Sequence, residues 1–181
     1  MLGSSETRDC DGSIRSGKDQ QMVTVETAIA VMWAYGVAWT SQDADAIVRL
    51  FDKDASYVER PGKSYEGVRA IRRYWRDNVR KQAKLRYRFV DDASEVLWDP
   101  AACCAVVKFQ AQFTSGTKGF VMQNEWLATV RFSSDGKIRR FEEYWHKLGH
   151  WDETYWTSAA TRLRESADDV SAISFPKTFR S

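Results

Sequence analysis

The chain has 181 residues, of which 43% are hydrophobic and 29% charged, and its formal net charge at pH 7 is only +2. This composition is ordinary for a soluble globular protein of one domain, and the net charge argues neither for nor against a polyanionic partner. No apolar run approaches the ~20 residues that a membrane-spanning helix needs, which excludes a membrane span of that kind.

Both ends of the chain differ from its middle. Residues 1–21 are polar, mixed in charge and without an apolar core, so they predict a disordered N-terminal tail rather than a secretory signal. We expect one domain over 22–150, followed by a C-terminal extension over 151–181 that contains a helix at 157–166.

Cysteine usage bears on the compartment. Cys10, Cys103 and Cys104 show neither the spacing of a metal site nor a plausible framework of disulfides. We interpret Cys103 and Cys104 as buried thiols in a strand. This pattern favours a reducing compartment, and we expect a cytoplasmic location.

The N-terminal half is predicted to be mainly helical. Over 23–39 the apolar residues recur at steps of four and three, which is typical of a helix with one buried face. The members of this stripe are Ala28, Met32, Tyr35 and Trp39. The next expected elements are a helix over 43–54, strands over 56–59 and 64–67 around a Pro-Gly turn, and a helix over 68–82.

Beyond the third helix, apolar and polar residues alternate. This period of two predicts strands over 85–98, 103–114, 119–133 and 137–148. Long antiparallel strands after a run of helices indicate an α+β fold, with the helices on one face of a curved sheet.

This order of elements resembles the NTF2-like cone fold, in particular its ketosteroid-isomerase-like and SnoaL-like branches. The resembling stretches, within residues 25–148, are QDADAIVRLFDKDASYVERP, YEGVRAIRRYW and WLATVRFSSDGKIRRFEEYW. The resemblance implies a strongly curved, mostly antiparallel sheet wrapped around three N-terminal helices, with a mostly apolar pocket at its open end. Because the fold serves isomerases, cyclases and dehydratases as well as binding modules, it does not fix the function.

The comparison with ketosteroid isomerases implies roles for individual residues. Tyr35 falls where those enzymes place a hydrogen-bonding phenol, and Glu59 falls where they place a carboxylate base. Ala128 falls where they place a second oxyanion donor, which argues against steroid isomerisation. An alignment on Pro61 puts Arg60 at the base position instead, and a guanidinium cannot abstract a proton. We expect Glu59 to face the pocket and keep Arg60 as the alternative.

Glu143 is a second candidate acid or base. Phe141 and Trp145 flank it on one strand face and would desolvate it, which would raise its pKa. The alternative is an ion pair with a neighbouring arginine at an open strand end. The residues expected to line a ligand pocket are Met32, Trp39, Asn124, Trp126, Ala128, Phe141 and Trp145.

Other features suggest no further partner or cofactor. His146 and His150 have a spacing that suits a metal only on a helix, so we expect no metal, and nothing calls for another cofactor. Residues 69–88 contain nine basic side chains and one acid, Asp77. A solvated helix face is the ordinary explanation, and we do not expect a nucleic-acid partner. We expect a homodimer through the outer face of the sheet.

These observations lead to one hypothesis and one alternative. The hypothesis is a protein that binds a small hydrophobic molecule and acts as a cofactor-independent isomerase, dehydratase or cyclase. Glu59 would be its base, Tyr35 its hydrogen-bond donor and Glu143 an auxiliary acid. The alternative is a non-catalytic ligand-binding or assembly module of the same fold, which Ala128 and the many bulky rings favour.

Overall fold

The computed structural model describes residues 23–89, 96–116, 119 and 121–147. Its helices are α1 (Val25–Thr40), α2 (Ala44–Arg49) and α3 (Gly67–Val79). Its strands are β1 (Phe51–Arg60), β2 (Ser64–Glu66), β3 (Gln82–Arg88), β4 (Leu97–Asp99), β5 (Cys104–Ser115), β6 (Val121–Phe132) and β7 (Ile138–Lys147). The predicted N-terminal tail, C-terminal extension and helix at 157–166 lie outside the described residues.

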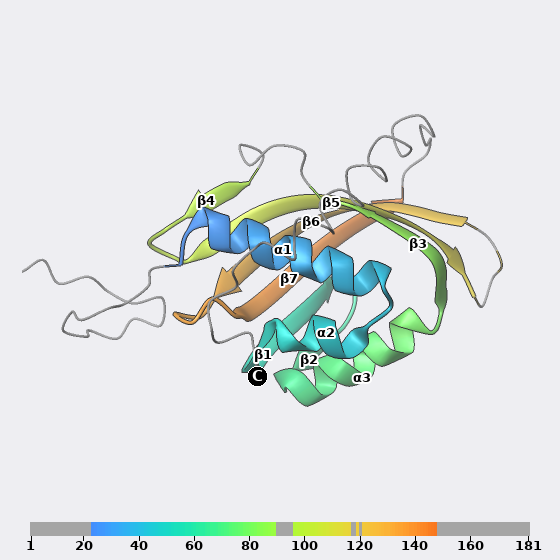
Figure 1. The fold of residues 1–181 in the computed structure, drawn as a ribbon, viewed down its shortest axis with the longest axis horizontal. Helices are drawn as coiled ribbons and strands as arrows, with labels where there is room; N and C mark the ends of the chain where they lie inside the picture. Colours follow the sequence, from blue (N-terminus) through green and yellow to red (C-terminus); the bar gives the residue numbers. More distant parts are fainter. Residues whose placement is uncertain (1–22, 90–95, 117–118, 120, 148–181) are drawn as a thin grey trace, which may run out of the picture.

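The strands form one sheet in the order β2–β1–β7–β6–β5–β3, and the short β4 also pairs with β5. Neighbouring strands run antiparallel except β1 and β7, which are parallel. Figure 1 shows the long strands β5, β6 and β7 curving together along α1, with α2 and α3 near β1 and β2. The predicted α+β fold with a curved, mostly antiparallel sheet and three helices is therefore confirmed.

The second helix is shorter than predicted. It begins after Asp43, whose carboxylate accepts a hydrogen bond from the Ala46 backbone N–H at 2.8 Å, and it is only six residues long. The chain then becomes extended at Phe51, because pairing with Ile138 of β7 buries the Phe51 ring in the core. The helix predicted over 43–54 is therefore wrong over 51–54, which belong to β1.

The predicted strand over 85–98 is divided into two elements. β3 pairs with the second half of β5, and β4 pairs with its first residues. The two pieces thus follow the same edge of β5; Phe89 and Val96 belong to neither strand, and 90–95 lie outside the described residues.

The interior of the cone is filled mainly by aromatic rings. Tyr35 on α1 is at its centre, 1% exposed. Its ring centroid lies between 5.3 and 6.4 Å from those of Trp39, Trp75, Tyr87, Phe109 and Phe141. Aromatic pairs at such distances stabilise a core beyond the burial of their area. The high aromatic content of the sequence therefore builds this core.

Gly36 of α1 packs directly against Tyr87 of β3. A methyl group at this position would overlap the buried ring of Tyr87. We expect Gly36→Ala to lower the free energy of unfolding, measured in urea, by about 3 kcal/mol, because a ring in a filled core cannot move aside. The same substitution should cost clearly less in a Tyr87→Leu background. Equal costs in the two backgrounds would contradict the overlap.

Two further observations concern the compartment. Cys104 is a half-buried free thiol, whereas Cys103 is disulfide-bonded to a partner that is not among the described residues. The interpretation of Cys103 as a buried thiol in a strand is therefore wrong, and cysteine usage no longer supports a reducing compartment. None of the helices in the described part of the chain is long and apolar enough to cross a membrane.

Candidate functional site

Two glutamates lie side by side on the inner face of the sheet. The parallel register of β1 and β7 places Glu59 beside Glu143 and, two residues earlier, Tyr57 beside Phe141. These positions share one face of the sheet because side chains alternate along each strand. Tyr57, Phe141 and Glu143 are buried, whereas Glu59 is half-buried. Glu59 is therefore the member of the pair nearer to solvent.

Glu143 is a carboxyl group inside the core, 4% exposed. Burial raises its pKa from 4.5 to about 8, the nearby Tyr57 hydroxyl partly opposes this rise, and the charge of Glu59 adds to it. The Tyr57 hydroxyl forms no hydrogen bond of good geometry with any described residue. It therefore lowers the pKa of Glu143 by lying near the carboxyl group rather than by a well-formed hydrogen bond. Glu143 therefore holds a proton at neutral pH.

Phenol groups surround Glu143. Burial first, and then the charge of Glu143, raises the pKa of each of these tyrosines well above the usual value: Tyr35, Tyr57, Tyr74 and Tyr87. The hydroxyl groups of Tyr57 and Tyr87 have no hydrogen-bond partner among the described residues. The centre of the cone is thus polar but uncharged.

Glu59 titrates in a different environment. Burial raises its pKa as well, but the charge of Lys63 favours the ionised carboxylate and partly opposes the rise. Glu143 is more deeply buried and has no cation among the groups that shift its pKa. The Glu143 carboxyl group therefore keeps its proton to a higher pH than the Glu59 carboxyl group does.

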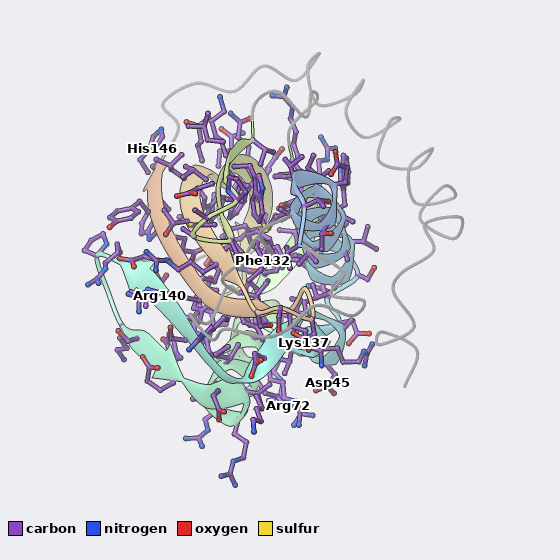
Figure 2. The ribbon with its side chains drawn as sticks, turned by 90° about the vertical axis from the view of Figure 1, so that its left-hand side faces the viewer. Asp45, Arg72, Phe132, Lys137, Arg140 and His146 are labelled. Atoms are coloured by element: carbon purple, nitrogen blue, oxygen red, sulfur yellow. The ribbon has the colours of Figure 1, made fainter. Side chains whose placement is uncertain are left out.

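Arg60, the alternative to Glu59, lies on the outer face. Its Nε donates a hydrogen bond to Glu142 Oε1 at 3.0 Å, and Arg140 Nη2 donates to Glu142 Oε2 at 2.8 Å. Hydrogen bonds from Arg140 and then Arg60 hold the pKa of Glu142 below its usual value. Figure 2 shows Arg140 beside β1 and β7 on the outside of the sheet. Of the two candidates, only Glu59 faces the interior.

A pocket of about 580 Å³ lies between the β1–β2 turn and α3, with Glu59 in its wall. Its lining residues are Glu59, Pro61, Gly62, Lys63, Tyr65, Ala70, Arg73, Tyr74, Asp77, Asn78, Lys81 and Trp145. This volume is in the usual range for small-molecule sites. Of the predicted site residues, Glu59 and Trp145 belong to this lining. Its charged side chains make it more polar than a pocket for a purely hydrophobic ligand.

The other predicted site residues are buried in the core and are not lining residues of this pocket. They are Met32, Tyr35, Trp39, Asn124, Trp126, Ala128, Phe141 and Glu143. Trp126, for example, stacks on Phe109 with a centroid distance of 5.4 Å. Asn124 is buried, and its Oδ1 has no hydrogen-bond partner in the described part of the chain.

Ala128 pairs with Glu143 across β6 and β7. By the resemblance, Ala128 stands where ketosteroid isomerases have an acidic oxyanion donor. In this chain an acid, Glu143, lies beside that position on the neighbouring strand. A comparison along one strand cannot show this substitution, because it depends on the register between two strands.

Several pocket residues were missed by the sequence analysis. The rings of Tyr65 and Tyr74 have a centroid distance of 4.4 Å and form one wall. Ala70, Tyr74 and Asn78 recur at steps of four along α3, which was an available signal. The more apolar stripe of this helix, which contains Ile71 and Trp75, obscured it.

Metal ligation finds no support in the described part of the chain. No group of three or more His, Cys, Asp and Glu side chains lies close enough there to hold an ion. His146, at the end of β7 in Figure 2, lies 3.6 Å from Glu125 on β6.

Comparison with protein families gives an identification. Residues 33–141, more than half of the chain, match the model of the SnoaL-like domain. The chain belongs to this family. The matched region runs from α1 into β7, so it includes Glu59 but ends before Glu143. No curated protein matches this SnoaL-like chain.

Solved structures show the same fold at low sequence identity. A putative isomerase from Bacillus subtilis has a TM-score of 0.61 and 17% identity, covering 68% of this chain and 90% of that one. SalBIII, described as an epoxide hydrolase/cyclase-like enzyme in pyran ring formation, has a TM-score of 0.57 and 18% identity, covering 68% and 95%. A hypothetical protein of ketosteroid isomerase-like fold from Catenulispora acidiphila has a TM-score of 0.55 and 12% identity, covering 72% and 92%.

Proposed function

We propose that this SnoaL-like protein is a cofactor-independent enzyme that moves a proton within a small organic molecule, as an isomerase, dehydratase or cyclase does. The observation that carries the proposal is Glu59, a half-buried carboxyl group in the wall of a pocket, next to the buried Glu143. Burial raises the pKa of both groups, most strongly that of Glu143, so Glu59 can act as a base beside an acid that keeps its proton. The isomerase and cyclase-like descriptions of two similar structures agree with this class.

Glu59 is the base in this proposal. Its carboxylate takes a proton from a carbon next to a carbonyl group. The electron pair of that C–H bond forms a carbon–carbon double bond, and the π pair of the carbonyl group moves onto its oxygen, which gives an enolate. Glu59, now a carboxylic acid, returns the proton to another carbon in an isomerisation or to a departing hydroxyl in a dehydration. The half-buried position of Glu59 favours this role, because a partly desolvated carboxylate is a stronger base.

Glu143 is a positioning residue rather than a group that contacts substrate. It is absent from the pocket lining, and its proton keeps a second negative charge away from the reacting carbon. Tyr35 and Tyr57 exclude water from it. We therefore assign Tyr35 to this buried shell, in place of the contact with substrate that the ketosteroid isomerases imply.

The proposal is tested with 5-nitrobenzisoxazole, a small C–H acid. A carboxylate removes its ring proton, the N–O bond breaks, and the electron pair stays on the oxygen of the coloured 2-cyano-4-nitrophenolate. We expect the wild-type protein to accelerate this reaction over acetate at equal concentration, and Glu59→Gln to abolish the acceleration. No acceleration by the wild-type protein, or an unchanged rate in Glu59→Gln, would exclude Glu59 as a base.

A non-catalytic binding module is the second candidate, and the filled interior favours it. The rings around Tyr35 occupy the space in which the cone was expected to open. The same reporter reaction separates the two candidates, because a binding module does not accelerate the ring opening of 5-nitrobenzisoxazole through Glu59, even if it binds the compound.

We also propose that two copies associate through the outer face of the sheet. Leu127 and Tyr144 are cross-strand neighbours there, and they are 51% and 50% exposed. Exposed apolar neighbours of this kind are common where a second protein covers a surface. Leu127→Asp should convert a dimer into a monomer in light scattering. A monomeric wild-type protein would exclude this arrangement.

A further inference from the structure

Three cationic side chains surround the mouth of the Glu59 pocket. Lys63 comes from the β1–β2 turn, Arg73 from α3 and Lys81 from the segment after α3, and all three are exposed. Lys63 and Glu59 line the same pocket, and the charge of Lys63 partly opposes the rise in the Glu59 pKa. For the side chains of Arg73 and Lys81, the described residues provide no ion-pair partner. The mouth therefore has positive charge that the described residues do not neutralise.

The acids near the pocket do not cancel this charge. Its lining contains two, Glu59 and Asp77. Asp77 is the one acid among the nine basic residues of 69–88. Elsewhere on α3, Arg72 and Arg76 are paired with Asp45 of α2, at 3.2 and 3.1 Å. Figure 2 shows Asp45 and Arg72 together, at one end of the molecule.

Three aromatic side chains belong to the lining of the pocket. Tyr65 and Tyr74 pack against each other with an angle of 35° between their rings, and Trp145, 37% exposed, also belongs to the lining. Aromatic side chains at a pocket surface bind planar unsaturated groups well, because both surfaces leave water together. The pocket thus combines a cationic mouth, aromatic walls and a single half-buried carboxylate.

We propose that the ligand of this pocket is a flat, unsaturated carboxylic acid in its anionic form, with its carboxylate at Arg73 and Lys81 and its rings or double bonds against Tyr65, Tyr74 and Trp145. The anion site is inferred from the lining of the pocket alone. That this ligand is also the substrate rests on the proposed function. The position of the carboxylate at the mouth leaves the unsaturated part of the ligand near Glu59.

Calorimetry of the full-length chain with 2-naphthoate and the matched neutral 2-naphthamide tests this inference. We expect 2-naphthoate to bind at least about tenfold more tightly, and the difference to shrink in salt because exposed charges are screened. Lys81→Gln and Arg73→Gln should each weaken naphthoate binding several-fold and leave naphthamide binding unchanged. Equal affinities for the two compounds, or no binding of either, would overturn the inference.

Matched controls remove the same charge elsewhere. Lys108→Gln changes an exposed lysine on the outer face of β5, and Arg69→Gln changes an arginine of α3 that does not line the pocket. Both should bind naphthoate like the wild-type protein. Losses as large as those of the mouth variants would show a general charge effect and would also overturn the inference.

This test is separate from the test of catalysis. Naphthoate binding that depends on Lys81, together with an unchanged reporter rate in Glu59→Gln, would support the anion site and reject the proposed enzyme. A reporter rate that depends on Glu59, together with equal affinities for naphthoate and naphthamide, would support the enzyme and reject the carboxylate ligand.

Discussion

Glu143→Gln should be more stable than the wild-type protein at pH 8, by on the order of 4 kcal/mol in the free energy of unfolding. The wild-type protein has a carboxyl group whose pKa rises from 4.5 in the unfolded chain to about 8 in the folded one. Between these values the folded state binds the proton more tightly. Stability is therefore lost as pH rises through this interval, by up to about 1.4 kcal/mol for each pH unit.

The measurement is urea unfolding of both proteins at several pH values from 5 to 8. Glutamine has nearly the shape of the protonated acid and does not ionise, so the two proteins should have similar stabilities near pH 5 and diverge as pH rises. A constant difference across the range would show that Glu143 is not a buried acid with a raised pKa.

Glu142→Gln is the matched control at the adjacent residue. Glu142 lies on the outer face, where hydrogen bonds from Arg140 and Arg60 lower its pKa. The ionised Glu142 therefore stabilises the fold at neutral pH, and this stabilisation is lost as the pH falls through its lowered pKa. The effect of Glu143 is the opposite, because its stabilisation is lost as the pH rises. This variant should be less stable than the wild-type protein at pH 7, and it should not gain stability at pH 8.

Glu59→Gln should lower the protein-dependent rate of 5-nitrobenzisoxazole ring opening by about 10²- to 10⁴-fold, the range in which a positioned general base contributes. The amide cannot accept the proton, and Glu59 is the half-buried carboxylate of the pocket. The rate of the wild-type protein should fall at low pH, as Glu59 becomes protonated. Because its pKa is raised, this fall should begin at a higher pH than for an exposed glutamate.

Glu66→Gln is the control for this substitution. Glu66 is an exposed glutamate on β2 that does not line the pocket, so its variant should keep the wild-type rate. Glu143→Gln should keep most of the rate near pH 7, where Glu143 is already uncharged, and should alter the pH profile above it. If Glu66→Gln loses as much activity as Glu59→Gln, the rate does not report on the pocket.

The amino-acid sequence by itself determined the fold class and the face of the sheet on which several residues lie. Alternation along β7 places Phe141, Glu143 and Trp145 on one face, as the local pattern predicted. Phe141 and Glu143 are buried there, and Trp145 is exposed at the pocket. Such predictions succeed because periodicity is a local property of the chain. The short α2 shows where they fail, since the extended start of β1 is imposed by β7.

Only the tertiary structure decided which groups meet. Glu59 and Glu143 become neighbours through the parallel pairing of β1 with β7, two strands separated by most of the domain. The same register places Arg60 against the outer face, where it pairs with Glu142. The pocket, likewise, needs the β1–β2 turn and α3 to come together. Register and packing between distant segments depend on the whole chain, so no local pattern could supply them.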